Sequence, residues 1–232
     1  METLVNIQNL TKKYGSVVAL DNISINLPQG RIIGLLGPNG SGKTTLIKLM
    51  NGLLQPSSGE IFIGGEPVGL ETKAMVSYLP DRNYLNNGDR VKNVLNQFER
   101  FYEDFDRDKA EEMLDSLQIS SKMKLKSMSK GTKEKMQLAL VMSRQAKIYI
   151  LDEPIAGVDP AARDFILRTI MDHRHPGATV LISTHLIADI EPVLDDAIFL
   201  QYGRILLANT VQNIRSEKGK SVDEVFREVF RC

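Results

Sequence analysis

The chain has 232 residues, a formal net charge of zero and charged side chains at 25% of its positions. A chain of this length buries a large hydrophobic core, which predicts one domain, or one domain with a subdomain. The balanced charge argues against a strongly electrostatic nucleic-acid-binding protein, so we expect no nucleic-acid partner. The single cysteine, Cys232, gives no basis for a disulfide framework or a cysteine metal site, and it fits a reducing compartment.

The sequence indicates neither a secretory leader nor a membrane span. Residues 1–6 do not combine a basic segment with a following apolar one, so we expect no secretory signal. No run of about 18 apolar residues occurs in the sequence, so we expect any membrane-crossing part to come from another chain.

Three strands are predicted before residue 37. Residues 4–7 have the composition of a strand, and residues 23–27 alternate between apolar and polar side chains. The apolar run Arg31-Ile32-Ile33-Gly34-Leu35-Leu36 is typical of a buried parallel strand. This third strand leads directly into a glycine-rich loop.

The glycine-rich loop has the sequence Gly37-Pro38-Asn39-Gly40-Ser41-Gly42-Lys43-Thr44-Thr45. Its glycines allow backbone N–H groups to turn inward and form a concave nest for an anion. At this spacing Lys43 is predicted to contact the β- and γ-phosphates of a nucleotide, and the Thr44 hydroxyl to bind Mg²⁺. A helical stripe follows, so the positive end of a helix adds to the nest; it comprises Leu46, Leu49, Met50 and Leu53. We therefore predict that this loop binds nucleotide phosphates.

The middle of the chain predicts two more strands and then a helical insertion. A turn at residues 56–59 precedes a strand at 60–63, and another strand at 76–80 ends at a proline. Residues 90–146 are rich in charged, helix-forming residues and carry three helical stripes of apolar side chains. The stripes are Val91, Val94, Leu95, Phe98 and Tyr102; Ala110, Met113, Leu114 and Leu117; and Met136, Ala139, Leu140 and Ser143. We interpret this segment as a helical subdomain inserted into an α/β core.

Strand character returns at residues 148–151 and 179–183, with a helix over about 161–173 between them. Asp152 and Glu153 follow the first of these strands directly, at the edge of a parallel sheet where ligands bind. Asp152 is expected to hold Mg²⁺, directly or through water, and Glu153 to polarise the attacking water as a general base. The last predicted helix starts from a cap at Ser221, and its apolar residues at 222, 225, 226, 229 and 230 favour docking on the protein's own core over a partner interface.

In this order, the motifs resemble the ATP-binding-cassette (ABC) ATPase family, and the resemblance covers nearly the whole chain. Tyr14 stands where the family's aromatic ring stacks on adenine, an edge-strand tyrosine being the alternative. Ser129 and Gly131 occupy the position of the family signature, within Met128-Ser129-Lys130-Gly131-Thr132. Asp159 matches the D-loop, and His185 matches the switch histidine that contacts the γ-phosphate.

The resemblance implies an α/β fold: a P-loop NTPase core with a mixed sheet flanked by helices, an antiparallel β subdomain and an inserted α-helical subdomain. Residues 1–232 would form one nucleotide-binding domain, with the core and β subdomain in 1–89 and 147–232 and the helical signature subdomain in 90–146. The implied cofactor is Mg²⁺ with ATP. The implied partners are a second cassette subunit, identical or different, and separate transmembrane permease chains, which places the protein in the cytoplasm at the inner face of the cell membrane.

The resemblance also implies that each ATP is shared between two subunits. Ser129 and Gly131 would contact the nucleotide bound by the opposite subunit, so that two ATP molecules are sandwiched head to tail. A lysine run leads into the signature, where positive potential would attract the partner's ATP; it comprises Lys122, Lys124, Lys126, Lys130, Lys133 and Lys135. The aromatic residues Phe98, Phe101, Tyr102 and Phe105 are expected in the helical core, with part of this cluster beside a groove for a membrane partner's helix.

The sequence departs from the family pattern in two places. Lys130 replaces the first glycine of the signature and Thr132 its glutamine. Asp81 stands where the family usually has a glutamine; we expect it to meet Mg²⁺ or accept from water, with pairing to Arg82 or to solvent as the alternative. Both departures are similar to a bacterial exporter-like subset of cassettes.

The leading functional hypothesis is the ATP-hydrolysing subunit of a membrane transporter. A soluble, non-transport ABC ATPase of translation, repair or iron–sulfur assembly is the alternative. Several proteins of that kind have two cassettes or long coiled-coil insertions, and the single phosphate loop and the lack of a heptad run disfavour those forms. A nucleotide-binding regulator that hardly hydrolyses ATP is a third hypothesis, against which Glu153 and His185 weigh.

Overall fold

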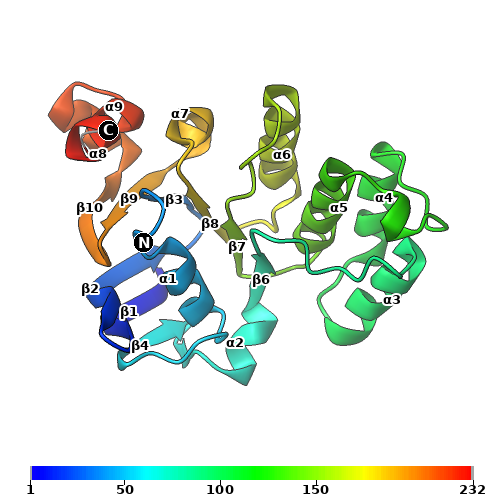
Figure 1. Cartoon of the computed structure of the whole chain (residues 1–232), viewed down its shortest axis with the longest axis horizontal. Helices are drawn as coiled ribbons and strands as arrows, with labels where there is room; N and C mark the ends of the chain where they lie inside the picture. The colour runs from blue at the N-terminus through cyan, green and yellow to red at the C-terminus, as the bar shows by residue number, and fades with distance from the viewer. Residues whose placement is uncertain (1, 231–232) are drawn as a thin grey trace.

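Two β-sheets organise the chain, with helices packed around them (Figure 1). The structure is a computed structural model that describes residues 2–230, so the expectation for Cys232 lies outside the described residues. The central sheet has the strand order β10-β9-β3-β8-β7-β6, and the second sheet has the order β2-β1-β4-β5.

The central sheet carries the ends of strands at which the predicted site lies. Neighbouring strands from β9 to β6 are parallel, and β10 pairs antiparallel with β9. Every residue of β3, β7 and β8 is buried, as expected for parallel strands covered on both faces. The strands are β3 (Ile32–Leu36), β6 (Val76–Leu79), β7 (Ile148–Asp152), β8 (Thr179–Thr184), β9 (Asp196–Gln201) and β10 (Arg204–Thr210).

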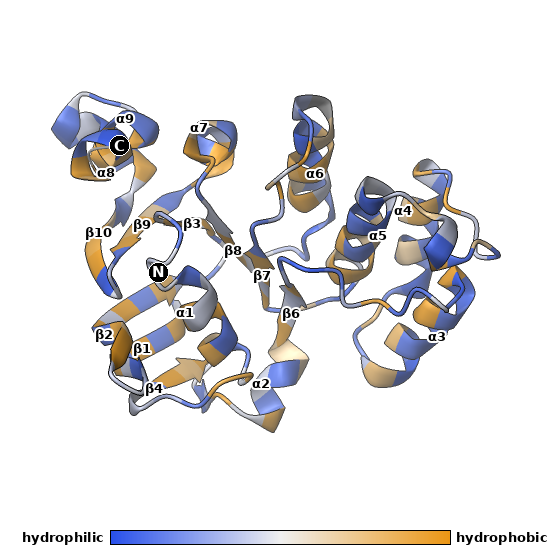
Figure 2. Cartoon of the chain, in the orientation of Figure 1, coloured by the Kyte–Doolittle hydropathy of each residue, from blue (hydrophilic) through white to orange (hydrophobic). Residues whose placement is uncertain are grey.

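The antiparallel sheet has longer strands than the sequence pattern predicts. It consists of β1 (Thr3–Tyr14), β2 (Val17–Pro28), β4 (Ser58–Ile63) and β5 (Glu66–Pro67). Polar and apolar residues alternate along β1 and β2 (Figure 2), but the register between the two strands shifts on both sides of Leu10. Asn9 and Asn22 have positive φ angles, of 48° and 50°. These irregularities break the period-two pattern, and each predicted strand is therefore shorter than the observed one.

The helices fall into two groups (Figure 1). Three of them, α3 (Val91–Phe101), α4 (Arg107–Ser116) and α5 (Lys130–Met142), lie together beyond β6. They bury the predicted apolar stripes except for Tyr102 and Leu117, which follow α3 and α4 and are only partly buried. The others are α1 (Lys43–Met50), α2 (Leu70–Met75), α6 (Pro160–His173), α7 (Ile187–Ile190), α8 (Val211–Lys218) and α9 (Val222–Phe230), with short 3₁₀ turns at Leu125–Ser127 and Glu191–Val193. None of the helices within residues 2–230 is long and apolar enough to cross a lipid bilayer.

The stripe predicted for α1 is wrong at its last position. The helix ends at Met50, and Leu53 lies beyond it with 58% of its surface exposed. Gly52 has a φ angle of 65°, which only a glycine adopts readily and which stops the helix. The predicted α/β fold, with a mixed sheet, an antiparallel sheet and a group of helices, is otherwise confirmed.

A buried arginine attaches the helical group to the central sheet. Arg144, which follows α5, donates to the carbonyl of Val76 at 2.6 Å and to Asp104 Oδ1 at 2.9 Å. Its guanidinium carbon lies 4.0 Å from the centroid of the Tyr102 ring. The Ser77 hydroxyl donates to the Val141 carbonyl at 2.9 Å. These contacts fix the C-terminal end of α5 against β6.

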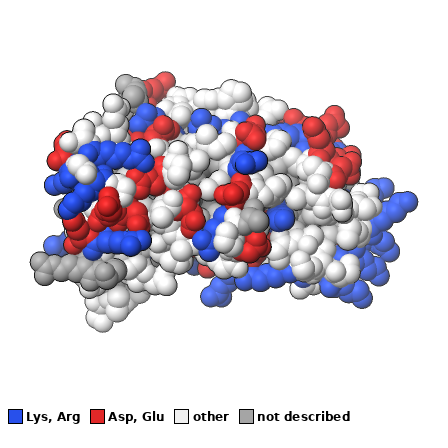
Figure 3. Space-filling view, turned by 90° about the horizontal axis from the view of Figure 1, so that it is seen from above, with Lys and Arg blue, Asp and Glu red and all other residues white. Residues whose placement is uncertain are grey.

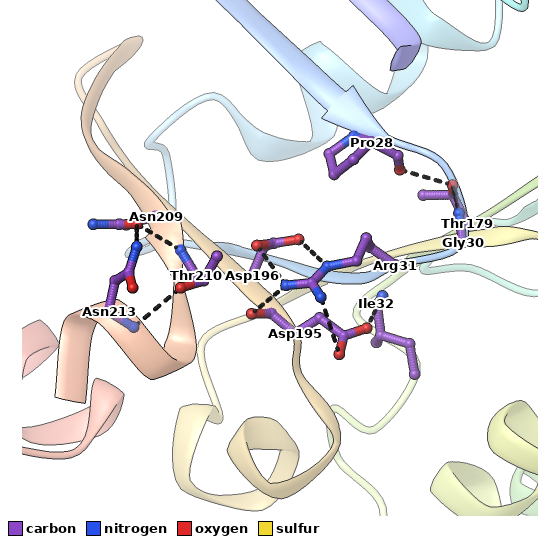
Figure 4. A network of polar contacts seen from close by, with 10 residues as sticks. All are labelled: Pro28, Gly30, Arg31, Ile32, Thr179, Asp195, Asp196, Asn209, Thr210 and Asn213. Atoms are coloured by element: carbon purple, nitrogen blue, oxygen red, sulfur yellow. Dashed lines mark hydrogen bonds and ion pairs between the residues drawn. The ribbon is translucent and has the colours of Figure 1, made fainter. Parts of the chain in front are cut away.

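Polar contacts join the two sheets at the strand ends that lie away from the phosphate loop (Figure 4). Arg31 donates to both carboxylate oxygens of Asp196, at 2.9 and 3.0 Å, and the backbone N–H of Ile32 donates to Asp195 at 2.8 Å. The Thr179 hydroxyl donates to the carbonyl of Pro28, at the end of β2. The starts of β3, β8 and β9 are therefore held together and joined to the antiparallel sheet.

The C-terminal helices pack on the core, as predicted. Phe226 and Phe230 of α9 contact the Phe199 ring of β9, at centroid distances of 5.4 and 5.9 Å. The Ser221 hydroxyl accepts from the N–H of Glu224, which confirms the predicted cap. Only Val229 of the predicted apolar positions is exposed, at 40%.

Candidate active site at the phosphate loop

The loop between β3 and α1 has no room for side chains at two of its glycines. A Cβ atom on Gly37 would lie 2.3 Å from the carbonyl oxygen of Leu200. A Cβ atom on Gly42 would lie 2.7 Å from the Ala19 carbonyl, and Gly42 has a φ angle of 111°. Gly40 is in open space but has a φ angle of 81°. Contact with β2 and β9 and the positive φ angles thus explain why glycines stand at these positions.

The N-terminus of α1 is open to an anion. No described side chain caps this helix, and its first turn carries no acidic residue. Lys43 is 6% exposed, and its Nζ donates to the carbonyls of Gly37 at 2.7 Å and Pro38 at 3.2 Å. Burial lowers the pKa of the Lys43 ammonium, and the charge of Glu153 opposes this shift. The loop therefore curls around a buried cation.

Asp152 closes this site from the end of β7. The residue is 1% exposed; its Oδ1 accepts from the Ser183 hydroxyl at 2.5 Å and from the Thr44 hydroxyl at 3.5 Å. Its Oδ2 is buried and has no hydrogen-bond partner among residues 2–230. Burial raises the pKa of the Asp152 carboxyl, and the hydrogen bonds from Ser183 and Thr44 oppose the shift. A hydroxyl beside a carboxylate with one unpaired oxygen is a donor set that suits Mg²⁺.

Glu153 links the loop to the end of β8. Its Oε2 lies 3.1 Å from His185 Nδ1, and its Oε1 lies 3.7 Å from Lys43 Nζ. The backbone of Glu153 has a φ angle of 51°, which is strained for a residue with a side chain, and its N–H donates to the carbonyl of Ser183. The strained turn directs the carboxylate back toward Lys43 and His185. The sequence predicted these residues but not the strained backbone.

Five of the predicted site residues line a cleft of about 560 Å³ beside the phosphate loop. The loop contributes Asn39, the end of β6 contributes Asp81, and the ends of β7 and β8 contribute Asp152, Glu153 and His185. Helix α5 contributes Lys130, Glu134 and Gln137 to the lining. Gln137 is absent from the sequence expectations, because a single glutamine within a helical stripe carries no recognisable motif.

Asp81 lies at the rim of this cleft. The carboxylate is 46% exposed and lies 3.9 Å from Arg82 Nε, and its charge adds to the raised pKa of Asp152 after the larger effect of burial. The position of Asp81 is therefore compatible with both predicted roles. It lines the cleft, as contact with Mg²⁺ or water requires, and it lies near Arg82, as pairing with that residue requires.

Four predicted residues outside the phosphate loop do not line the cleft. Tyr14 ends β1 with 47% of its surface exposed, and Lys12 Nζ lies 5.2 Å from the centroid of its ring. Asp159 caps α6 by accepting from the N–H of Ala162 at 3.0 Å. Ser129 caps α5 by accepting from the N–H of Thr132 at 3.1 Å, and Gly131 is exposed in the first turn of α5.

Basic side chains gather at the end of the molecule formed by α3, α4 and α5 (Figure 3). The exposed members of the lysine run are Lys122, Lys124, Lys126 and Lys130. Lys130 Nζ lies 3.7 Å from Glu134 and is 84% exposed. The surface around the start of α5 is therefore positively charged.

A second cavity, of about 510 Å³, lies between α1, β6 and α3. We call it the aromatic groove; its lining includes Leu53, Tyr78, Tyr84, Phe98 and Tyr102. Phe98 and Phe105 are buried at 9% exposure, as predicted for core residues, but Phe101 is 76% exposed and does not belong to the core. Phe101 lies on the exposed face of α3, and it was not part of the apolar stripe predicted for this helix.

Comparison with known proteins identifies the family. Residues 20–156 match the family described as ABC transporter. The ABC transporter ATP-binding protein YhcH of Bacillus subtilis (strain 168) is 31% identical over 242 residues, which cover 99% of this chain and 76% of that protein. The Nod factor export ATP-binding protein I of Cupriavidus metallidurans is 29% identical, over 97% of this chain and 78% of its own length. A solved structure of an ATP-binding subunit of an ABC transporter superposes with a TM-score of 0.88 at 28% identity, covering 98% of this chain and 100% of the other.

ATP-binding subunits of this kind bind nucleotide and work with transmembrane partners. The fold, the phosphate loop and the acidic strand end agree with these matches across nearly the whole chain. The chain therefore belongs to the ABC transporter family, in which it is an ATP-binding subunit that hydrolyses ATP to drive transport.

Proposed function

We propose that this chain hydrolyses ATP in the cleft beside the phosphate loop, with Glu153 as the general base. The backbone N–H groups of the loop and the Lys43 ammonium bind the phosphates. These N–H groups belong to Gly37, Asn39, Gly40, Ser41, Gly42, Lys43, Thr44 and Thr45, whereas Pro38 has no N–H and its carbonyl accepts from Lys43. Thr44 and Asp152 would hold Mg²⁺, which neutralises phosphate charge when bound; the unpaired Oδ2 of Asp152 supports this assignment. Asp81, at the rim of the same cleft, is proposed as a further contact to the metal or its water.

The contacts of Glu153 are the observation that carries this proposal. Its carboxylate lies between Lys43 and His185, so it can accept a proton from a water that attacks the terminal phosphate. His185 holds Oε2 of Glu153 and stands at the end of β8, where it can also contact the transferred phosphoryl group. Tyr14 is proposed to stack on the adenine ring, since nearly half of its surface is free.

We further propose that two cassettes close head to tail over two ATP molecules. Gly131 supports this arrangement, because a Cβ there would meet no described atom within 4 Å outside its own helix backbone and chain neighbours, and its φ angle is not positive. A glycine is explained if another molecule approaches the start of α5 closely. Ser129, at the same helix N-terminus, would donate to the partner's γ-phosphate, and Asp159 would lie in the same interface.

We propose that the aromatic groove receives a cytoplasmic helix of a transmembrane permease. Its lining combines exposed Leu53 and Tyr84 with the partly buried Tyr78 and Tyr102, which suits the apolar face of an amphipathic helix.

The protein would then lie in the cytoplasm, on the inner face of the cell membrane. One nucleotide-binding domain would contain a core in residues 1–89 and 147–232 and a helical signature subdomain in 90–146. The similarity to a Nod factor export protein favours export and an exporter-like subset over the soluble, non-transport alternative.

The test is the variant Glu153→Gln, which keeps the shape of the side chain but cannot accept the proton. We expect ATP hydrolysis to fall by about 10²–10⁴-fold, while ATP binding persists and a dimer accumulates with ATP. Hydrolysis can be followed by phosphate release, and the dimer by size-exclusion chromatography with light scattering. Hydrolysis at the wild-type rate would show that Glu153 is not the base. Failure to co-purify a permease chain from native membranes would instead favour the soluble alternative.

A further inference from the structure

Gln137 has a buried amide that nothing in the described chain satisfies. The residue is 2% exposed and lies in the middle of α5. Its Nε2 is buried and has no hydrogen-bond partner within residues 2–230. Buried amide donors are nearly always paired, so an unpaired one requires an explanation. Gln137 also lines the cleft that contains Asp152 and Glu153, which indicates that the missing acceptor belongs to the reaction.

The position of Gln137 follows from helical spacing. Lys130, Glu134 and Gln137 are four and then three residues apart, so they share one face of α5, and all three line the cleft. Lys130 and Glu134 pair with each other at 3.7 Å near the exposed start of the helix. Gln137 lies one turn deeper, where its Nε2 has no partner in residues 2–230.

The C-terminal half of α5 holds Gln137 at a fixed distance from the strand ends. Ser77 of β6 donates to the carbonyl of Val141, and Arg144 donates to the carbonyl of Val76. Both contacts lie within about two turns of Gln137, so the helix backbone that carries this side chain is held against β6. A donor fixed in this way is preorganised, which is the condition under which a single hydrogen bond affects a reaction.

The lining that Gln137 shares includes three carboxylates that can act as acceptors, together with the basic side chains of Arg82 and His185. The carboxylates are those of Asp81, Asp152 and Glu153. Hydrolysis brings a water and phosphate oxygens to the same place. An amide does not titrate, so Gln137 cannot serve as the acid or the base. Its available contribution is to orient an oxygen atom.

We propose that Gln137 is a further catalytic residue, whose amide donates a hydrogen bond to the water that Glu153 activates. The water then gives a proton to Glu153, accepts from Gln137 and directs its remaining lone pair at the terminal phosphate. Because Gln137 belongs to α5, the rate of hydrolysis depends on the position of this helix against the strand ends. The inference rests on the proposed function of Glu153.

The test compares Gln137→Leu, Gln137→Glu and the wild type. Leucine fills a similar volume and removes an unpaired buried donor, so the midpoint of thermal unfolding should stay the same or rise. The kcat for ATP should fall about tenfold, a smaller loss than for donors that contact transition-state charge directly. The KM and the affinity for a non-hydrolysable ATP analogue should not change. Gln137→Glu keeps the length but replaces the donor by an acceptor, so its kcat should fall as well.

Gln97→Leu, an exposed glutamine of α3, is the matched control and should leave kcat unchanged. The double variant Gln137→Leu with Glu153→Gln should be no slower than Glu153→Gln alone, because both residues act on one water. A wild-type kcat in Gln137→Leu, with a raised unfolding midpoint, would overturn the inference and leave Gln137 as a packing residue. Full activity in Glu153→Gln would instead overturn the proposed function itself, so the two failures are distinguishable.

Discussion

At the scale of the residue, the phosphate loop is defined by how closely its backbone passes other strands. The Gly37→Ala variant places a methyl group 2.3 Å from the Leu200 carbonyl, so the loop must move away from β9. We expect a loss of about 1–3 kcal/mol in the free energy of unfolding, as for other overpacked sites. ATP affinity should fall too, because the N–H groups that line the nest shift. Urea unfolding and calorimetric titration with an ATP analogue measure the two effects.

Gly88→Ala is the control for Gly37→Ala. Gly88 does not have a positive φ angle, and the atom nearest to the added methyl group would be a flexible side-chain oxygen of Asn86 at 3.4 Å. The control should keep both stability and ATP affinity. Equal ATP affinity in Gly37→Ala and the wild type would contradict the assigned role of the loop.

Some features of the site can be recognised from residue spacing within one segment, whereas others depend on contacts between segments that are far apart in the sequence. Gly37–Thr45 is recognisable because its chemistry depends on spacing within nine residues, and the structure gives its glycines physical reasons. Glu153 is recognisable by its place after an apolar strand, but its φ angle of 51° depends on contacts with Ser183 that lie 30 residues away. The unpaired amide of Gln137 depends on which strand ends face α5, so no local pattern contains it.

At the scale of the element, the C-terminal helices depend on one buried carboxylate. Glu191 is 7% exposed; its oxygens accept from the N–H groups of Val222 and Asp223, at the start of α9, and from Arg215 of α8. Burial alone would raise the pKa of the Glu191 carboxyl, but these hydrogen bonds outweigh it, so the pKa lies below its ordinary value. The charged carboxylate therefore stabilises the folded state.

The Glu191→Gln variant should lose about 1.5–3 kcal/mol of unfolding free energy at pH 7, the range for hydrogen bonds to a charged group. Because the folded pKa is depressed, the stabilisation is fully present above the unfolded pKa, about 4.3, and is lost as the pH falls through the folded value. Denaturant unfolding at pH 7 and at acidic pH should therefore show a difference between variant and wild type that narrows in acid. A difference that stays constant with pH would mean that packing, not charge, holds the helices.

The start of α6 was predicted to within about one residue, because the signals for it are local. Proline at 160 and the cap at Asp159 define the start of α6, and both lie in the sequence itself. The ends of β1 and β2 were not predictable, because register shifts and positive φ angles at Asn9 and Asn22 disturb their alternation. The extent of these strands is set by pairing with each other and with β4, which is a tertiary property.

At the scale of the whole molecule, Gly131 tests the proposed head-to-tail dimer. Among residues 2–230, an alanine Cβ at this position would meet no atom within 4 Å beyond its own helix backbone and chain neighbours. Alanine also has the higher helix propensity, so Gly131→Ala should fold at least as stably as the wild type. In the Glu153→Gln background, its ATP-dependent dimer should be weakened. Light scattering with and without ATP measures this, with Gly88→Ala as the control. An undiminished dimer would mean that no partner atom approaches Gly131 closely.

The aromatic groove tests the proposed permease contact. Leu53 is 58% exposed in its lining, so Leu53→Asp removes apolar surface without opening the core. We expect basal ATP hydrolysis by the isolated chain to persist and co-purification with permease chains to be lost. Leu206→Asp, at a 48% exposed position of β10, is the control and should keep the association. Retained association in Leu53→Asp would place the contact elsewhere.

The lysines at the end formed by α3–α5 have a practical consequence for handling the protein. The formal charge is zero, yet basic side chains gather at this end, one of the places where Figure 3 shows them, so charge is unevenly distributed over the surface. A cation-exchange resin interacts only with the protein surface that faces the resin. At low ionic strength we expect the resin to retain this neutral chain through the basic end formed by α3–α5. Elution should then require more salt than net charge suggests, and charge-reversal at Lys122 and Lys124 should abolish the retention.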